Sequence, residues 1–328
     1  MDVQFSSNVA FLDIYGRMLV ASGDVQNGLA VLRRALVIAP KSVPLLRAYA
    51  AALLLAKDTQ GAQDTIAKAV ALNPSDESLK VALIETAYAA GGKEAAQAAA
   101  RSVTFGGADD PLASIIMAAA LSHSGKLDDA IDTLTKIRPE AMNARATRML
   151  AGLYVAKGER ERGLQLLRSW LDKNPKDNTT RSALASALMG GRDYDGAIAE
   201  YERVSKDQPQ DFIALSNLAW LYLQKNDARA LETAQAAYKI SPGAPLVADT
   251  LGWILLKKGD VRAAEPYLAS AGAALPNNLD IQYRWAVALY RNGKKPEAQA
   301  ILEKITATQV NFSSKPDAEK LLADIKGG

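Results

Sequence analysis

Aromatic side chains gather between residues 212 and 290, which hold nine of the chain's 20. Trp220 and Trp253 are prominent there, with Asn217 before the first of them and Arg284 after the second. Tryptophan, tyrosine and arginine are the residue types that most often dominate binding energy at protein interfaces. An asparagine amide can in addition hydrogen-bond to an extended peptide backbone. These residues indicate recognition of a partner; the alternative interpretation is that the tryptophans only pack between neighbouring helices.

The sequence offers little to a catalytic mechanism. His123 is the only histidine, and the absence of cysteine excludes thiolate nucleophiles, disulfides and cysteine-based zinc sites. No serine stands in a G-x-S-x-G setting, and no phosphate-binding G-x-x-x-x-G-K-[ST] loop is present. The acidic pairs Asp109-Asp110 and Asp128-Asp129 are explained by helix capping and the helix dipole. We therefore predict a protein that is not an enzyme and that needs no cofactor or metal.

Composition and charge narrow the class of partner. The 328 residues include 39 basic and 36 acidic side chains, a net charge of +3 without the basic stripe typical of nucleic-acid binding. No apolar run reaches membrane-spanning length, and the first residues lack the features of a signal peptide. We expect a protein or peptide partner, no nucleic acid, and no insertion of this segment into a membrane. Residues 1–8 are predicted to be a leader left by truncation of a longer chain.

A proline recurs at a spacing of 33 or 34 residues, with one interval of about three periods. The markers are Pro40, Pro74, Pro175, Pro209, Pro242 and Pro276. A fixed period between 20 and 50 residues indicates stacked supersecondary units. Such an array grows by adding units instead of enlarging one core.

Each period contains two apolar-periodic stretches of about 12–14 residues, long enough for helices. A polar break such as 258–260 separates them; its glycine closes the first helix, and the proline ends the second. Asp76, Asp177 and Asp211 are expected to cap the units that follow them. The sequence therefore predicts an all-α chain of helix–turn–helix units. We expect nine units at 9–42, 43–76, 77–110, 111–143, 144–177, 178–211, 212–244, 245–278 and 279–305, then a linker at 306–314 and a capping helix at 315–328.

Small residues recur where two helices must approach closely. Alanine occupies the twentieth position of five units: Ala62, Ala130, Ala197, Ala264 and Ala298. Four residues further on, a bulky side chain fills the space between the helices: Leu32, Ile66, Leu134, Leu167, Tyr201, Leu268 and Leu302. This pattern over residues 9–305 resembles the tetratricopeptide repeat family. The resemblance implies a right-handed superhelical solenoid whose first helices line a concave groove.

Carrying that groove over to this sequence gives the candidate partner-binding residues. They are Asn217, Trp220, Gln224, Asp249, Thr250, Trp253, Lys257, Tyr283, Arg284, Tyr290, Arg145 and Arg148. Trp220 and Trp253 share the ninth position of adjacent units, so we expect them to be neighbours on the groove wall. A mild excess of basic side chains favours an acidic or polar partner.

Two units depart from the pattern. The third has an alanine-rich second stretch at 93–103, beside Gly91 and Gly92. Burial of a leucine-sized side chain contributes roughly 1.5–3 kcal/mol, so we expect a helix of low stability and a bend there. The seventh unit is one residue short at its turn, 225–227.

The stretches 217–220, 247–256 and 312–322 resemble a particular group of tetratricopeptide-repeat proteins. They are similar to the C-terminal repeats of lipoproteins associated with exosortase (PEP-CTERM) and exopolysaccharide systems. That resemblance implies a scaffold in the bacterial periplasm or at the outer membrane, in polymer export or protein sorting; without it we expect a cytoplasmic protein. The lipid-attachment cysteine of that group is absent here. A scaffold that guides a polysaccharide and a helical-repeat RNA-binding protein are the alternatives.

Overall fold

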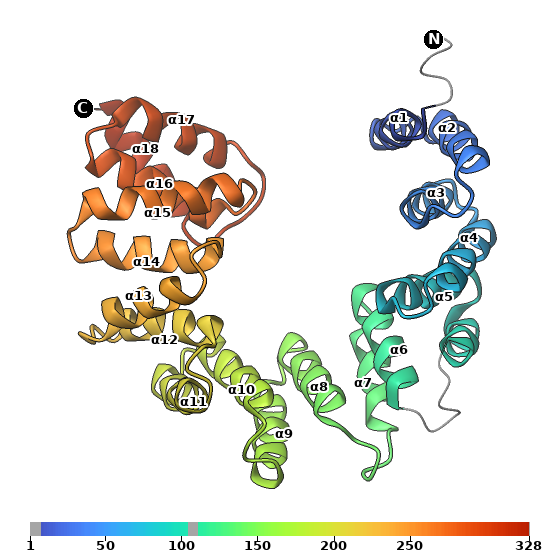
Figure 1. Ribbon diagram of the computed structural model, residues 1–328, viewed down its shortest axis with the longest axis horizontal. Coiled ribbons are helices and arrows are strands. Elements are labelled where there is room, and N and C mark those ends of the chain that lie inside the picture. The colour runs from blue at the N-terminus through green and yellow to red at the C-terminus, as the bar shows by residue number, and fades with distance from the viewer. Residues whose placement is uncertain (1–7, 104–110, 328) are drawn as a thin grey trace. The chain divides into compact units, whose positions relative to one another are not determined.

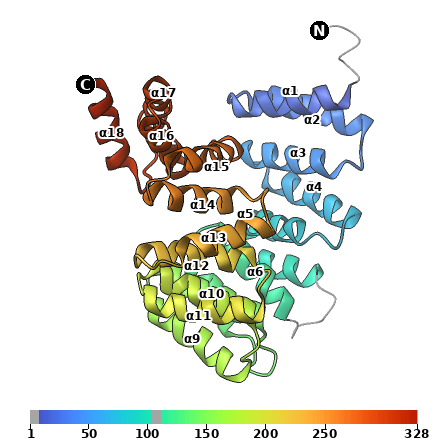
Figure 2. The ribbon, with the colours of Figure 1, turned by 60° about the vertical axis from the view of Figure 1, so that its left-hand side comes forward.

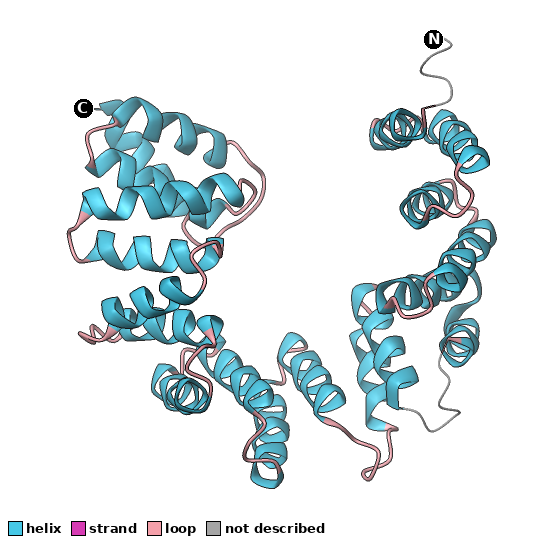
Figure 3. Cartoon of the chain, viewed as in Figure 1, coloured by secondary structure: helices cyan, strands magenta, loops and turns pink. Residues whose placement is uncertain are grey.

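The computed structural model describes residues 8–103 and 111–327, and all regular structure in those ranges is helical (Figure 3). The chain forms two compact units, Met1–Leu166 and Leu167–Gly328. Within each unit, helices that follow one another along the chain pack side by side (Figures 1 and 2). The predicted all-α solenoid of paired helices is confirmed.

The first unit contains α1 (Val9–Ala21), α2 (Val25–Ile38), α3 (Val43–Leu55), α4 (Thr59–Leu72), α5 (Glu77–Ser102), α6 (Pro111–His123), α7 (Leu127–Thr135) and α8 (Ala144–Ala156). The boundary between the units falls within α9 (Arg160–Lys173). The second unit continues with α10 (Asn178–Gly190), α11 (Tyr194–Asp207), α12 (Phe212–Gln224), α13 (Ala230–Ile240), α14 (Pro245–Lys257), α15 (Val261–Ala274), α16 (Leu279–Arg291), α17 (Lys295–Thr306) and α18 (Lys315–Gly327).

Local backbone chemistry explains where the helices begin and end. Asp76, Asp177 and Asp211 accept hydrogen bonds from backbone N–H groups in the first turns of α5, α10 and α12, as predicted. Gly259 takes a φ of +90° between α14 and α15. Glycine adopts this left-handed conformation without the strain that a Cβ would cause. The predicted punctuation of the helix pairs is confirmed at these positions.

Small residues set against bulky ones fix the distance between paired helices. Ala264 and Leu268 of α15 are fully buried, and a Cβ on Gly252 of α14 would lie 2.7 Å from Leu268 Cγ. The other bulky positions expected from the sequence are buried as well: Leu32, Ile66, Leu134, Leu167, Tyr201 and Leu302. The periodic sequence pattern therefore corresponds to the interiors of the helix pairs.

The third unit contains the expected break. The backbone of α5 leaves helical geometry at Gly91 (φ −146°, ψ 19°) and Gly92 (φ 71°, ψ −156°). The second half of α5 buries Ala96, Ala99 and Ala100. Ala100 lies where most other units have leucine, isoleucine or tyrosine, and together with Met117 of α6 it lines a cavity of about 230 Å³. The alanine-rich segment thus leaves space that a larger side chain would fill.

We expect Ala100→Leu to raise the free energy of unfolding of the first unit by about 1 kcal/mol, because cavity filling typically contributes 0.5–2 kcal/mol. In the wild type, amide hydrogens in the second half of α5 should exchange faster than those in α4 and α6. Ala98→Leu on the exposed side of the same segment is the control. Equal exchange protection across α4, α5 and α6 would contradict a helix of low stability.

The shortened seventh unit keeps its turn and loses the beginning of its second helix. Asn226 takes a φ of +53°. The Asp227 N–H donates to the carbonyl five residues earlier over 2.8 Å, as the Asp260 N–H does over 3.0 Å in the next unit. However, α13 begins only at Ala230, whereas α15 begins directly after Asp260. The expectation of a shorter turn was therefore wrong, because the missing residue removes the first turn of α13 instead.

Near the end of the described chain, α18 packs against α17. Ala318 and Ile325 are buried in this contact, within a cluster that includes Leu302 and Ile305 of α17. The polar side chains of α18, such as Glu319 and Lys320, remain exposed. The helix therefore presents a polar outer face.

Candidate functional site

The predicted groove residues of the second unit lie on α12, α14 and α16, and α14 contacts both of the other two helices. They differ in accessibility. Gln224 and Lys257 are exposed, whereas Asp249 has only 4% of its surface exposed. The others are half-buried: Asn217, Trp220, Thr250, Trp253, Tyr283, Arg284 and Tyr290.

Asp249 of α14 forms an ion pair with Arg284 of α16 through Oδ2 and Nη1. The side chain of Asp249 is 6% exposed and that of Arg284 is 23% exposed. Burial raises the pKa of the Asp249 carboxyl above its ordinary value, and the Arg284 guanidinium offsets part of that rise. Asp249 is therefore the buried member of the pair, and it positions Arg284, which is the more accessible partner.

Trp253 and two cations form the most concentrated cluster on this surface. The Lys257 Nζ lies 4.7 Å from the centroid of the Trp253 ring, and the Arg284 Cζ lies 5.4 Å from it. A cation within about 6 Å of an aromatic ring centroid is attracted by the ring's electron density. The structure thus brings together three residues that the sequence analysis selected from two successive repeats.

Polar contacts fix the neighbouring positions. Thr250 Oγ1 accepts a hydrogen bond from Ser216 on α12 over 3.1 Å, which links α12 to α14. Asn217 Nδ2 donates to Tyr201 Oη over 2.9 Å, and Ser186 lies 3.0 Å from the same hydroxyl. The Asn217 amide is therefore partly engaged inside the unit, and it keeps its carbonyl oxygen and one N–H for other contacts.

The remaining aromatic candidates have structural neighbours. The Trp220 ring packs edge-to-face on Tyr194 of α11, with centroids 5.7 Å apart. In the described part of the chain, the Trp220 and Trp253 rings do not contact each other. Tyr283 and Tyr290 pack against the cluster that α16 shares with α17 and α18, and burial raises the pKa of Tyr283. These residues contribute to the core of the unit as well as to its surface.

Arg145 and Arg148 lie on α8 in the first unit. Both terminal nitrogens of Arg145 contact the Glu77 carboxylate at the start of α5, one of them over 2.8 Å. This pairing lowers the pKa of Glu77. Arg148 is half-buried on the next turn of α8. Arg145 is therefore engaged with the protein's own carboxylate.

A cavity of about 420 Å³ opens beside Trp253. Its lining residues are Leu223, Gln224, Asn226, Asp227, Ala230, Trp253, Lys257 and Lys258. Sequence reasoning selected Gln224, Trp253 and Lys257 and missed the other five residues. The signal for the missed residues was the one-residue shortening of the seventh unit, because Asn226, Asp227 and Ala230 flank the missing first turn of α13.

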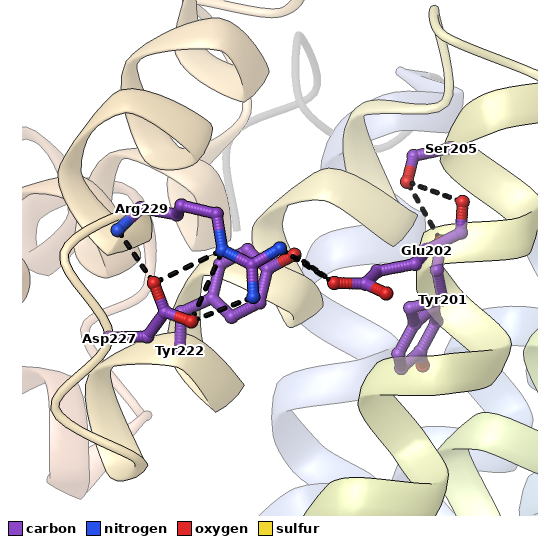
Figure 4. A network of polar contacts seen from close by, with 6 residues as sticks. All are labelled: Tyr201, Glu202, Ser205, Tyr222, Asp227 and Arg229. Carbon is purple, nitrogen blue, oxygen red and sulfur yellow. Dashed lines mark hydrogen bonds and ion pairs between the residues drawn. The ribbon is translucent and has the colours of Figure 1, made fainter.

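Arg229 holds this irregular segment in place (Figure 4). Its backbone N–H and its guanidinium both donate to Asp227, and its Nη1 pairs with Glu202 of α11 at 2.8 Å. The guanidinium also lies 4.1 Å from the centroid of the Tyr222 ring. Tyr222 Oη donates to Glu202 Oε1 over 2.7 Å, and burial together with this contact raises the pKa of Tyr222. The network substitutes for the missing helical turn.

The described residues provide no cluster of three or more histidine, cysteine or acidic side chains suited to a metal ion. His123, the single histidine, pairs with Glu85 at 3.1 Å at the exposed end of α6. None of the helices in the described ranges combines the length and the apolar character needed to cross a membrane.

Two family models, each described as tetratricopeptide repeat, match residues 182–245 and 255–325. These two segments are tetratricopeptide repeats. Proteins built from tetratricopeptide repeats are typically non-catalytic scaffolds for other proteins. The matched segments contain α12 and α16, and the short interval between them contains Trp253.

Three solved structures are similar to parts of the chain. A MamA RS-1 ArsTM double mutant is 18% identical, with 55% of this chain and 97% of that chain covered and a TM-score of 0.43. MamA AMB-1 is 18% identical, with coverage of 48% and 95% and a TM-score of 0.41. MamA 41-end from Desulfovibrio magneticus RS-1 is 19% identical, with coverage of 49% and 92% and a TM-score of 0.43. No curated protein sequence matches the chain.

Proposed function

We propose that the protein is a non-enzymatic scaffold that binds a segment of a partner protein on the surface formed by α12, α14 and α16. The observation that carries this proposal is the half-buried Trp253 ring, which lies beside a cavity and under two cations from neighbouring turns and helices. Tryptophan and arginine anchors in a partly desolvated setting are the usual centres of binding energy at protein interfaces. Gln224 and Lys257 provide an exposed polar rim.

Capture of partners from an extract of cells that express the chain tests this proposal. The Trp253→Ala variant, alone and combined with Trp220→Ala, should no longer capture proteins that the wild type retains. We expect the affinity to fall at least tenfold, because a hot-spot residue contributes about 2 kcal/mol or more. Trp170→Ala is the control, because Trp170 is a half-buried tryptophan on α9, outside the proposed surface. If the wild type and the Trp220/Trp253 double variant capture the same proteins, these residues do not form the partner-binding surface.

The cellular setting in this proposal is the bacterial envelope, in exopolysaccharide export or protein sorting. Its support is the resemblance of the 217–220, 247–256 and 312–322 stretches to repeats of envelope lipoproteins. The genes adjacent to the coding sequence test it directly, because an envelope scaffold of this kind is expected beside genes for polymer export or sorting. Unrelated neighbouring genes in several genomes would argue against that setting.

Binding of a polysaccharide is the second candidate, and the geometry around Trp253 separates it from peptide binding. Sugars stack on open aromatic faces, whereas the Trp253 ring already has the Lys257 ammonium and the Arg284 guanidinium over it. The Trp220 ring is likewise engaged by Tyr194. The cations next to the cavity favour a partner that carries negative charge over a neutral sugar chain.

A further inference from the structure

The cavity beside Trp253 combines features that specify the chemistry of an occupant. Its volume of about 420 Å³ falls within the range of 300–1,000 Å³ that is usual for ligand pockets. It is large enough for one or two side chains of a bound peptide. The inference drawn below rests on the proposed function, because it concerns the same surface.

The origin of the cavity lies in the seventh repeat. In the next repeat, α15 begins directly after Asp260, so its first turn fills the corresponding position. In the seventh repeat, α13 begins at Ala230, and Asn226, Asp227 and Ala230 line the cavity. The space therefore lies where a regular repeat has helix. The Arg229 network fixes the surrounding backbone, so the cavity is a built feature of this repeat.

The charges around the cavity do not cancel. Asp227 is the only carboxylate in its lining, and both of its oxygens are engaged by Arg229, which lowers the pKa of Asp227. Lys257 and Lys258 are exposed. Across residues 8–103 and 111–327, no carboxylate forms an ion pair with either lysine. Two cations are thus available to an incoming group.

The helix dipole of α14 accounts for part of this arrangement. Lys257 is the last residue of α14 and Lys258 is its C-cap, where positive charge is stabilised by the helix end. The dipole does not account for the other polar groups. Gln224 and Asn226 also line the cavity, and the side-chain amide of neither forms a hydrogen bond to another described residue. Each amide therefore retains two N–H donors beside its carbonyl oxygen, so the cavity combines two cations with amide donors, and its one carboxylate is already paired with Arg229.

We propose that this cavity binds the side chain of an aspartate or glutamate in the partner protein. The carboxylate pairs with Lys257 and Lys258 and accepts hydrogen bonds from Gln224 and Asn226. Trp253, which holds the Lys257 ammonium over its ring, provides the apolar wall for the residue next to the acid. Charge-assisted hydrogen bonds of this kind are about twice as strong as neutral ones, so the acidic side chain is an anchor of the bound segment.

Selection from a random 12-residue peptide library displayed on phage tests the proposal with the full chain. The displayed peptides are fused at their C-termini, so any acidic preference comes from side chains and not from a terminal carboxylate. The wild type should enrich aspartate and glutamate next to an apolar residue. A synthetic, C-terminally amidated copy of a selected peptide should lose about tenfold in affinity when its acid is replaced by the corresponding amide, a loss in line with one charge-assisted contact.

Charge reversal identifies the residues responsible. Lys257→Glu/Lys258→Glu should shift the selection toward lysine and arginine, whereas Lys304→Glu/Lys320→Glu, an equal change of charge at exposed positions on α17 and α18, should leave it acidic. Lys257→Gln/Lys258→Gln provides the same test if the reversal lowers thermal stability. Trp253-dependent peptides without acidic enrichment would overturn the acidic subsite and leave the proposed function standing. The absence of any Trp253-dependent peptide would remove the proposed function, and this inference with it.

Discussion

Replacing Arg284 by alanine is expected to lower the free energy of unfolding of the second unit by about 3 kcal/mol at neutral pH, because it leaves a buried charge without its partner. Asp249 is 4% exposed, and its Oδ1 already lacks a hydrogen bond. The Arg284 guanidinium is the group that compensates its charge. Thermal or denaturant unfolding measures the loss. Arg291→Ala, which removes an exposed arginine from the end of the same helix, is the matched control.

The dependence of this loss on pH identifies its cause. The folded-state pKa of Asp249 is raised above its ordinary value of 3.8, and removal of Arg284 raises it further. For an acid with a raised pKa, the stabilising contribution of the protonated form is complete below 3.8 and is lost as pH rises through the folded-state pKa. The deficit of Arg284→Ala should therefore shrink as pH falls from neutrality, and Asp249→Asn in the same background should recover part of it. A deficit that does not change with pH would indicate lost packing instead of an uncompensated charge.

Tyr201→Ala is expected to lower the free energy of unfolding by about 4 kcal/mol, because truncation of a buried aromatic side chain leaves a cavity. Tyr201 is 1% exposed and occupies the position of the bulky residue in the sixth repeat. Tyr201→Phe should cost only about 1 kcal/mol, the usual net contribution of a hydrogen bond. It removes the contacts to Ser186 and Asn217, and both of these side chains remain partly accessible to water.

Unfolding followed by circular dichroism, with hydrogen exchange in α11 and α12, measures both Tyr201 variants. Tyr267→Ala is the control, because Tyr267 is half-buried on α15 and packs on Tyr238. If phenylalanine at position 201 proves as costly as alanine, the hydroxyl contacts, and not the filling of the repeat interior, dominate at this site.

The parts of the fold that depend on local sequence were predictable. A glycine at a left-handed turn, an aspartate at a helix start and an alanine opposite a bulky residue act within a few residues or within one helix pair. For that reason Asp76, Gly259 and Ala264 could be interpreted directly from their spacing. The break at Gly91 and Gly92 was predictable on the same ground, since two adjacent glycines precede a segment without bulky apolar residues.

The parts that depend on pairs of repeats were not predictable. Repeat numbering placed Asp249 among the groove residues, but it is buried, and its ion-pair partner Arg284 lies in the next repeat. The role of Arg229 could not be predicted from spacing, because its partner Glu202 belongs to the preceding repeat. Lys258 lines a cavity beside the late start of α13, and the sequence showed only that one residue was missing. Only the backbone structure shows that the residue is missing from the beginning of α13 and not from the turn.

The ion pair between Asp249 and Arg284 also constrains how this protein can evolve. Arrays of repeats change length readily when a whole repeat is duplicated or deleted, provided that each junction accepts any neighbour. Here the junction between α14 and α16 requires a specific neighbouring repeat. Asp249 on α14 and Arg284 on α16 carry opposite charges that form one buried ion pair. Loss or exchange of either repeat alone would strand a charge in the interior. We therefore expect the two repeats to be retained or replaced together, and the surface around Trp253 with them.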